Sequence, residues 1–221
     1  MNDLDTSLVG RTCTPDRPLR VAVLASGGGS NLQALLDARG QGPWDVVNVV
    51  VNVAGAGAID RARAAGVSVV VVPHVGLSRA EHEGRVLDVL GAHDVELVVL
   101  AGYMRVVTEV FVSRFPQRIL NVHPALLPSF PGLHGARQAL SHGCRVTGCT
   151  VHLVDGGVDT GPILAQAAVP ILDDDNEATL QRRIQLQEHK LLPAVVTAWS
   201  EGRVVQRGGL TRCCGVVVAA G

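Results

Sequence analysis

The feature that most constrains the fold is a series of short, Val-rich apolar runs separated by segments with helical periodicity. The first run, 19–25, leads through a glycine-rich turn into a segment with apolar residues at Leu32, Leu35 and Leu36. Alternating strands and helices form βαβ units with right-handed crossovers. Nearly continuous apolar strands are typical of a parallel sheet covered by helices. The pattern therefore predicts an α/β fold, a doubly wound, mostly parallel sheet with helices on both faces.

The same reasoning divides the chain into elements. We expect strands at 19–25, 46–53, 67–72, 95–101, 119–120, 147–154 and 163–171. We expect helices that begin at a Ser30 cap and at a Ser78 capping box, and helices over 59–65, 108–115, 136–142 and 176–200. Residues 1–18 are expected to be a disordered leader, 19–204 a single domain, and 205–221 a C-terminal tail with no assigned structure.

Composition excludes several functional classes. The chain has 19 Lys and Arg against 20 Asp and Glu, so it has no long-range field that would attract nucleic acid or a membrane surface. Its five cysteines lack C-x-x-C spacing, which indicates reduced thiols. We find no secretory signal and no apolar run of membrane-spanning length. We therefore expect a cytoplasmic protein with no metal, no nucleic-acid partner and no membrane anchor.

The turn after the first strand, 26–31, can bind an anion. A turn between a strand and a helix directs backbone N–H groups at a ligand, and Ser30 and Asn31 add side-chain donors. The turn has neither G-x-G-x-x-G spacing nor the Lys of a Walker loop, so the expected anion is a small phosphate. The alternative is that the glycines only allow a tight turn.

Two polar side chains follow the apolar residues of the fifth strand. Asn121 and His123 are two positions apart on an extended chain, so both side chains point the same way and can touch one substrate atom. Open α/β sheets place their chemistry where such strands end. The alternative is that Asn121 caps the loop and His123 is an ordinary buried histidine.

Three other segments also have two interpretations. Arg79 lies in the first turn of a helix, where a cation opposes the helix dipole; it is either solvated or binds a ligand carboxylate. Residues 104–107 either belong to the core or line a slot for an aromatic heterocycle. Asp155 and Asp159 lie in a glycine-containing loop and are either merely exposed or functional.

Four motifs, in order, closely resemble the glycinamide ribonucleotide formyltransferase family of purine biosynthesis. They are Ser-Gly-Gly-Gly-Ser-Asn-Leu-Gln (26–33), Ala-Gly-Tyr-Met-Arg (101–105), Asn-Val-His-Pro-Ala-Leu-Leu-Pro-Ser-Phe-Pro-Gly-Leu-His (121–134) and Val-His-Leu-Val-Asp-Gly-Gly-Val-Asp-Thr-Gly-Pro (151–162). The resemblance covers roughly residues 19–204 and implies a Rossmann-like formyltransferase fold. It also implies that the formyl group of 10-formyltetrahydrofolate is transferred to the amine of glycinamide ribonucleotide. Whether such a protein is a monomer or a homodimer stays open.

The resemblance further implies roles for individual residues. The residues that match the family's catalytic positions are Asn121, His123 and Asp159. Those that would bind the ribonucleotide are Gly29, Ser30, Asn31, Gln185 and Glu188. Those that would bind the folate are Arg79, Met104, Arg105, Val106, Val107, Asn121, Asp155, Gly156, Gly157, Val158 and Asp159. In this chemistry the amide and an imidazolium donate to the oxygen that gains charge, and the carboxylate accepts the proton of the amine directly or through water.

Three alternative functions fit the sequence less well. Methionyl-tRNA formyltransferase would require a further C-terminal domain that binds tRNA, for which the chain has neither the length nor the basic charge. Formyltetrahydrofolate deformylase would require an additional N-terminal regulatory domain. A noncatalytic nucleotide- or folate-binding module would have no reason to combine Asn121, His123 and Asp159.

Overall fold

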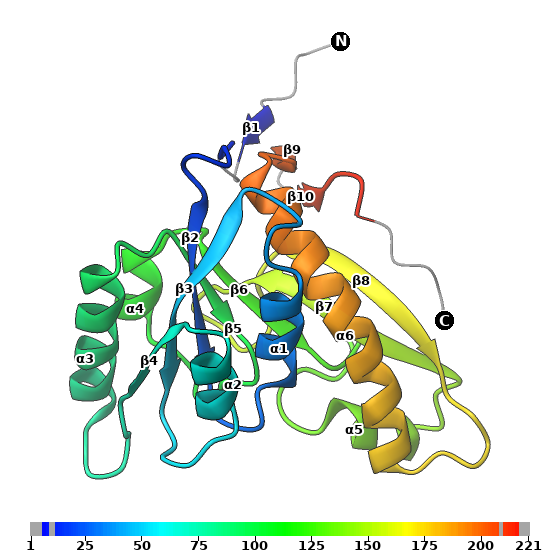
Figure 1. Cartoon of the computed structure of the whole chain (residues 1–221). Helices are drawn as coiled ribbons and strands as arrows, with labels where there is room; N and C mark the ends of the chain where they lie inside the picture. Colours follow the sequence, from blue (N-terminus) through cyan, green and yellow to red (C-terminus); the bar gives the residue numbers. More distant parts are fainter. Residues whose placement is uncertain (1–5, 9–11, 208–209, 217–221) are drawn as a thin grey trace.

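A seven-stranded sheet lies at the centre of the computed structural model, which describes residues 6–8, 12–207 and 210–216 (Figure 1). Across the sheet the strands are β4 (Ser68–Val71), β3 (Trp44–Val51), β2 (Leu19–Ala25), β5 (Leu97–Leu100), β6 (Ile119–His123), β7 (Val146–Leu153) and β8 (Ile163–Pro170). The strands from β4 to β6 are parallel, and β7 and β8 are antiparallel to their neighbours. The predicted fold class is confirmed.

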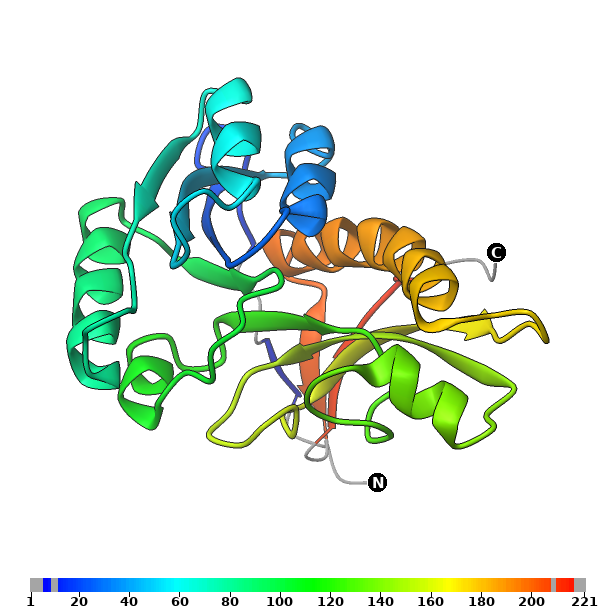
Figure 2. The same cartoon turned by 90° about the horizontal axis from the view of Figure 1, so that it is seen from below.

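Helices cover both faces of this sheet (Figures 1 and 2). One face carries α1 (Ser30–Asp37), α2 (Ala58–Ala64), α5 (Gly135–Ser141) and α6 (Glu177–Ser200), and the other carries α3 (Arg79–Ala92) and α4 (Glu109–Arg114). Strand β2 packs against both helix layers, because its successive side chains point to opposite faces of the sheet. Val21 and Val23 pack in the cluster that contains α1 and α6, whereas Ala22 and Leu24 pack in the cluster that contains α3 and α4.

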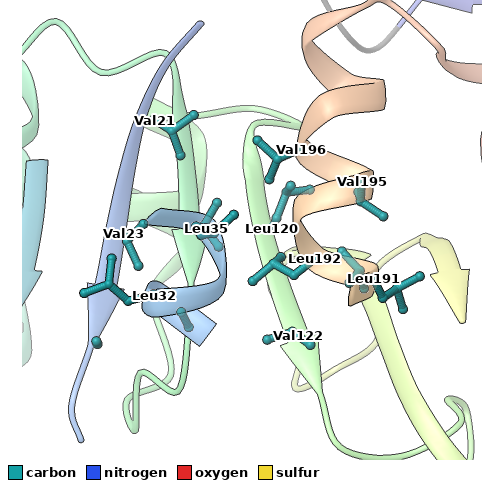
Figure 3. Close-up of a cluster of buried hydrophobic side chains, with 14 of the residues drawn as sticks. Val21, Val23, Leu32, Leu35, Leu120, Val122, Leu191, Leu192, Val195 and Val196 are labelled. Atoms are coloured by element: carbon teal, nitrogen blue, oxygen red, sulfur yellow. The ribbon is translucent and has the colours of Figure 1, made fainter. Parts of the chain in front are cut away.

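The α1 and α6 layer is built from fully buried aliphatic side chains (Figure 3). Leu32 and Leu35 of α1 and Leu191 and Leu192 of α6 are at most 1% exposed. Burial of one such side chain contributes roughly 1.5–3 kcal/mol. Although α6 is 24 residues long, no helix in the described ranges is both long and apolar enough to cross a membrane.

The strand order brings three carboxyl ends together. Strands β3 and β4 lie on one side of β2, and β5 and β6 lie on the other. The glycine-rich turn follows β2, residues 101–107 follow β5, and the loop after His123 follows β6. Ligands of open α/β sheets bind where the strand order reverses in this way.

Both ends of the described chain contribute to a second, small sheet. Strand β1 (Thr6–Leu8) pairs with β9 (Val204–Arg207), and β9 pairs with β10 (Leu210–Cys213), all antiparallel. The structure thus differs from the expected disordered leader at β1 and adds two strands to the tail that was left unassigned. A pairing between such distant segments leaves no local pattern in the sequence. Residues 1–5, 9–11, 208–209 and 217–221 lie outside the described residues.

Most predicted elements are present, with small shifts at their ends. The strand expected at 46–53 is β3, which starts earlier because Trp44 pairs with Leu19. The predicted Ser30 cap is wrong: Gly29 is the N-cap, without a side-chain hydrogen bond, and Ser30 is the first helical residue. The Ser78 capping box is confirmed.

Candidate active site

A cavity of about 340 Å³ opens where β5 and β6 end. Among its lining residues are the predicted site residues Met104, Arg105, Val106, Val107, Asn121, His123, Asp155, Gly157, Val158 and Asp159. Apolar walls are added by Leu100, Leu133 and Val154. A mostly apolar cavity with a few convergent polar groups is typical of a small-molecule site.

The three residues that match the catalytic positions are in direct contact. Asn121 Nδ2 donates to Asp159 Oδ1 over 3.2 Å. His123 Nδ1 lies 3.2 Å from Asp159 Oδ2, and the backbone N–H of Gly132 donates to the same oxygen over 2.8 Å. Because Asp159 touches both side chains, Asn121 and His123 do share one face of β6, as their spacing predicts. Asp159 also adopts a left-handed backbone, with φ of 54°, which costs free energy and is common at functional sites.

His152 is a fourth polar member of this cluster, and the sequence motifs did not single it out. In the register of β6 and β7, His152 stands directly opposite Asn121. Its Nδ1 donates to the Leu153 carbonyl, and its Nε2 lies 3.1 Å from Asn121 Nδ2 and 3.5 Å from Asp159 Oδ1. A neutral ring therefore accepts from Asn121, whereas a protonated ring donates to Asp159. A histidine within a strand that is otherwise apolar was the available signal, but only the register shows that it faces Asn121.

The loop after β6 holds His123 in a fixed orientation. His123 Nε2 donates to the Phe130 carbonyl over 2.8 Å. Phe130 has a φ of 57°, a left-handed conformation unusual for a bulky residue. Farther back, Thr150 Oγ1 donates to the Ala125 carbonyl and accepts from Leu127 N–H. These bonds fasten the loop to β7, so the imidazole has little freedom to turn.

The protonation of His123 and Asp159 is coupled. Both ring nitrogens of His123 face oxygen acceptors, so a proton must lie between Nδ1 and Asp159. Burial lowers the pKa of His123, and the Asp159 carboxylate offsets part of that effect. Burial alone would raise the pKa of Asp159, but hydrogen bonds from His152 and Gly132 and the charges of nearby imidazoles hold it below its ordinary value. The pair can therefore take up or release a proton at the cavity wall.

The glycine-rich turn is anchored to α2. Gly29 has a φ of 75°, and a Cβ there would lie 2.8 Å from the Cα of Ala58. Ala58 N–H donates to the Gly27 carbonyl, and Arg61 Nε donates to the Gly28 carbonyl over 2.8 Å. The turn thus approaches α2 more closely than any residue with a side chain at position 29 would allow.

The predicted ribonucleotide-binding residues come from both ends of the domain. Asn31 Nδ2 donates to Glu188 Oε2 over 2.8 Å, across 157 positions of sequence. Glu188 is 4% exposed, and its burial raises its pKa to about 7, which the Asn31 amide only partly offsets. Asn31 Oδ1 is buried and has no hydrogen-bond partner among the described residues. A buried acid with an unpaired acceptor beside it can receive a ligand N–H group. Gln185, one turn before Glu188 on α6, is partly buried.

Other predicted residues lie apart from these contacts. Arg79 is exposed at the first position of α3, and neither Arg79 nor Gly156 is among the residues that line the cavity. Asp155 Oδ1 accepts from Gly157 N–H and from Thr160 Oγ1, so it shapes its own loop. Within the described ranges, no group of three or more His, Cys, Asp or Glu side chains is arranged to hold a metal ion.

Several known proteins that are similar to this chain are formyltransferases. The formyl transferase family matches residues 19–196. The phosphoribosylglycinamide formyltransferase of Mycobacterium tuberculosis H37Rv is 48% identical over 192 residues, which cover 83% of this chain and 86% of that protein. That of Escherichia coli K12 is 39% identical over 189 residues, 84% of this chain and 89% of that protein. Glycinamide ribonucleotide transformylase 1 from Symbiobacterium toebii superposes with a TM-score of 0.86 at 46% identity, covering 89% of this chain and 94% of that one.

Proposed function

This chain belongs to the formyl transferase family, and from that premise we propose that it transfers the formyl group of 10-formyltetrahydrofolate to the amine of glycinamide ribonucleotide. The products are formylglycinamide ribonucleotide and tetrahydrofolate. The observation that carries the proposal is the contact of Asn121, His123 and Asp159 on the wall of an apolar cavity. The catalytic domain spans 19–204, a range that the family match to 19–196 supports.

The cavity suits the donor. A flat heterocycle fits among the apolar side chains of Met104, Val106, Val107 and Val158, which line the cavity. The glycine-rich turn and Glu188 suit the acceptor, because backbone N–H groups bind phosphate and a buried carboxyl can accept from an amine or amide. Arg79 and Gly156 are kept as folate-binding residues on family resemblance alone.

The reaction joins the amine nitrogen to the formyl carbon and builds negative charge on the formyl oxygen. Asn121 Nδ2 and His123 Nδ1, whose N–H groups face Asp159 in the structure, share those N–H groups with the formyl oxygen. This lowers the barrier because the donors are positioned in advance. The attacking nitrogen must also lose a proton, and the coupled pair of His123 and Asp159 accepts it. The formyl carbon then separates from the folate nitrogen, which takes up a proton to give tetrahydrofolate.

The first experiment measures transfer directly. Purified protein is mixed with glycinamide ribonucleotide and 10-formyltetrahydrofolate, and formation of both products is followed. His123→Ala is expected to lower kcat by at least roughly 100-fold, the usual contribution of a positioned acid or base. His93→Ala is a matched control, since His93 bonds to Val89 and Ser68 outside the cavity. Full activity of His123→Ala would refute the mechanism.

A further inference from the structure

One segment of the cavity wall has few backbone bonds of its own. Residues 102–107 all line the cavity and lie outside helices and strands. In the described part of the chain, the backbone N–H groups of Tyr103, Arg105, Val106 and Val107 have no hydrogen-bond partner. A stretch without backbone pairing takes its shape from whatever anchors its ends.

The first anchor is Ser26, the residue that follows β2. Its N–H donates to the Gly102 carbonyl over 3.1 Å. Its Oγ accepts from Met104 N–H over 2.8 Å and donates to Asn52 Oδ1 over 2.6 Å. Because an amide N–H can only donate, the hydroxyl proton must go to Asn52. Asn52 is 3% exposed, so its side chain is buried beside Ser26 and holds the hydroxyl group in one orientation.

The second anchor is Glu83 on α3. Thr108 N–H donates to Glu83 Oε1 over 2.9 Å, and Thr108 Oγ1 donates to Glu83 Oε2. Glu83 is 6% exposed, and no Lys, Arg or His in the described ranges forms an ion pair with it. A buried carboxylate without a cation is stabilised by its hydrogen bonds, so the Glu83 side chain and Thr108 hold each other in position.

We infer that Ser26, backed by Asn52, and Glu83 are positioning residues that hold segment 102–107 and thereby set where the formyl donor lies. The inference rests on the proposed function. The two substrates are affected differently, because residues 27–29 of the glycine-rich turn, which follow Ser26, have their own anchors at Ala58 and Arg61. Loss of the Ser26 hydroxyl should therefore loosen the donor site and leave the ribonucleotide site in place.

The test is a comparison of KM values. Ser26→Ala is expected to raise the KM for 10-formyltetrahydrofolate about tenfold, the effect of losing one hydrogen bond of about 1.4 kcal/mol. The KM for glycinamide ribonucleotide should stay within about twofold, because its anchors are untouched. Ser26→Thr, which keeps the hydroxyl, should restore most of the donor KM. The control is Ser113→Ala, since Ser113 is exposed and bonds only within α4.

A second readout does not depend on turnover. Hydrogen exchange of the Met104 amide should be faster in Ser26→Ala than in the wild-type chain, because its acceptor is gone. Unchanged donor KM together with unchanged exchange would overturn the inference.

If the wild-type chain transferred no formyl group, the proposed function would fail, while the exchange comparison would still decide the role of Ser26. If Ser26→Ala did not fold, Glu83→Ala, which removes both acceptors of Thr108, should raise the donor KM alone. An unchanged donor KM in that variant would overturn the inference.

Discussion

At the scale of single residues, Glu188 shows how burial of a carboxyl group lowers the stability of the folded chain at neutral pH. A carboxyl group that is 4% exposed and has no cationic partner in the described ranges is costly to ionise, and its pKa is raised to about 7 for that reason. A folded state with a raised carboxyl pKa retains a proton that the unfolded chain has already lost. The contribution of Glu188 to the free energy of unfolding is therefore greatest at low pH. It declines as pH rises from 4.5 toward about 7.

We predict that Glu188→Gln removes this pH dependence. The loss in the wild-type chain is at most about 3 kcal/mol at 1.36 kcal/mol per pKa unit. Relative to the wild type, the variant should gain free energy of unfolding between about pH 5 and about pH 8. Urea denaturation at both pH values measures this gain, with Glu109→Gln, on an exposed glutamate, as the control. If the difference in free energy of unfolding between Glu188→Gln and the wild type did not change with pH, the raised pKa of Glu188 would be contradicted.

Asp159 is the residue at which proton transfer can be separated from binding. Asp159→Asn keeps the size of the side chain but removes the carboxylate that faces His123. We expect kcat to fall by roughly 100-fold while the affinity for tetrahydrofolate changes little, because proton acceptance is lost and the cavity keeps its shape. Steady-state kinetics and calorimetric titration with tetrahydrofolate measure the two effects. Unchanged turnover would remove Asp159 from the catalytic set.

At the scale of elements, the turn between β2 and α1 shows why its glycines are not equivalent. Gly29 combines a left-handed φ with direct contact on α2, whereas a Cβ at Gly28 would meet nothing within 4 Å. The sequence pattern predicts that the Ser30 side chain caps the start of α1. The structure shows that the backbone of Gly29 makes the start possible instead.

We predict that Gly29→Ala impairs both folding and ribonucleotide binding. A left-handed conformation costs a residue with a side chain about 1–2 kcal/mol, and the contact with Ala58 adds to this. The KM for glycinamide ribonucleotide should rise by about tenfold or more as the turn moves. Thermal denaturation and steady-state kinetics measure both changes. Gly28→Ala is the control, and equal effects of the two substitutions would contradict this account of the turn.

At the scale of the whole molecule, the layers of the sheet keep distant site residues in register. Helix α6 buries Glu188 together with the core side chains Ile184 and Leu191, which lie one turn before it and one turn after it. Packing of α6 against α1 therefore determines whether Glu188 can reach Asn31. The small sheet of β1, β9 and β10 lies against β8 and the end of α6, away from these contacts (Figure 1).

We predict that Leu192→Ala lowers the free energy of unfolding by about 2–5 kcal/mol, because it opens a cavity in the layer shown in Figure 3. Leu186 on the same helix is 56% exposed, so Leu186→Ala should change stability by no more than about 0.5 kcal/mol. Urea denaturation of both variants measures the difference. Similar losses in the two variants would show that α6 does not pack as described.

The sequence by itself determined the fold class and nearly every element, since side-chain periods of 2 and 3.6 mark strands and helices locally. It also placed Asn121 and His123 on one face, because that follows from spacing along a single strand. Their roles, with that of Asp159, stay proposals. Only the tertiary structure decided that Asp159 touches both side chains, that His152 stands opposite Asn121, and that Asn31 meets Glu188. Those contacts join segments far apart in the chain, and strand order, register and helix packing set them, none of which a local pattern encodes.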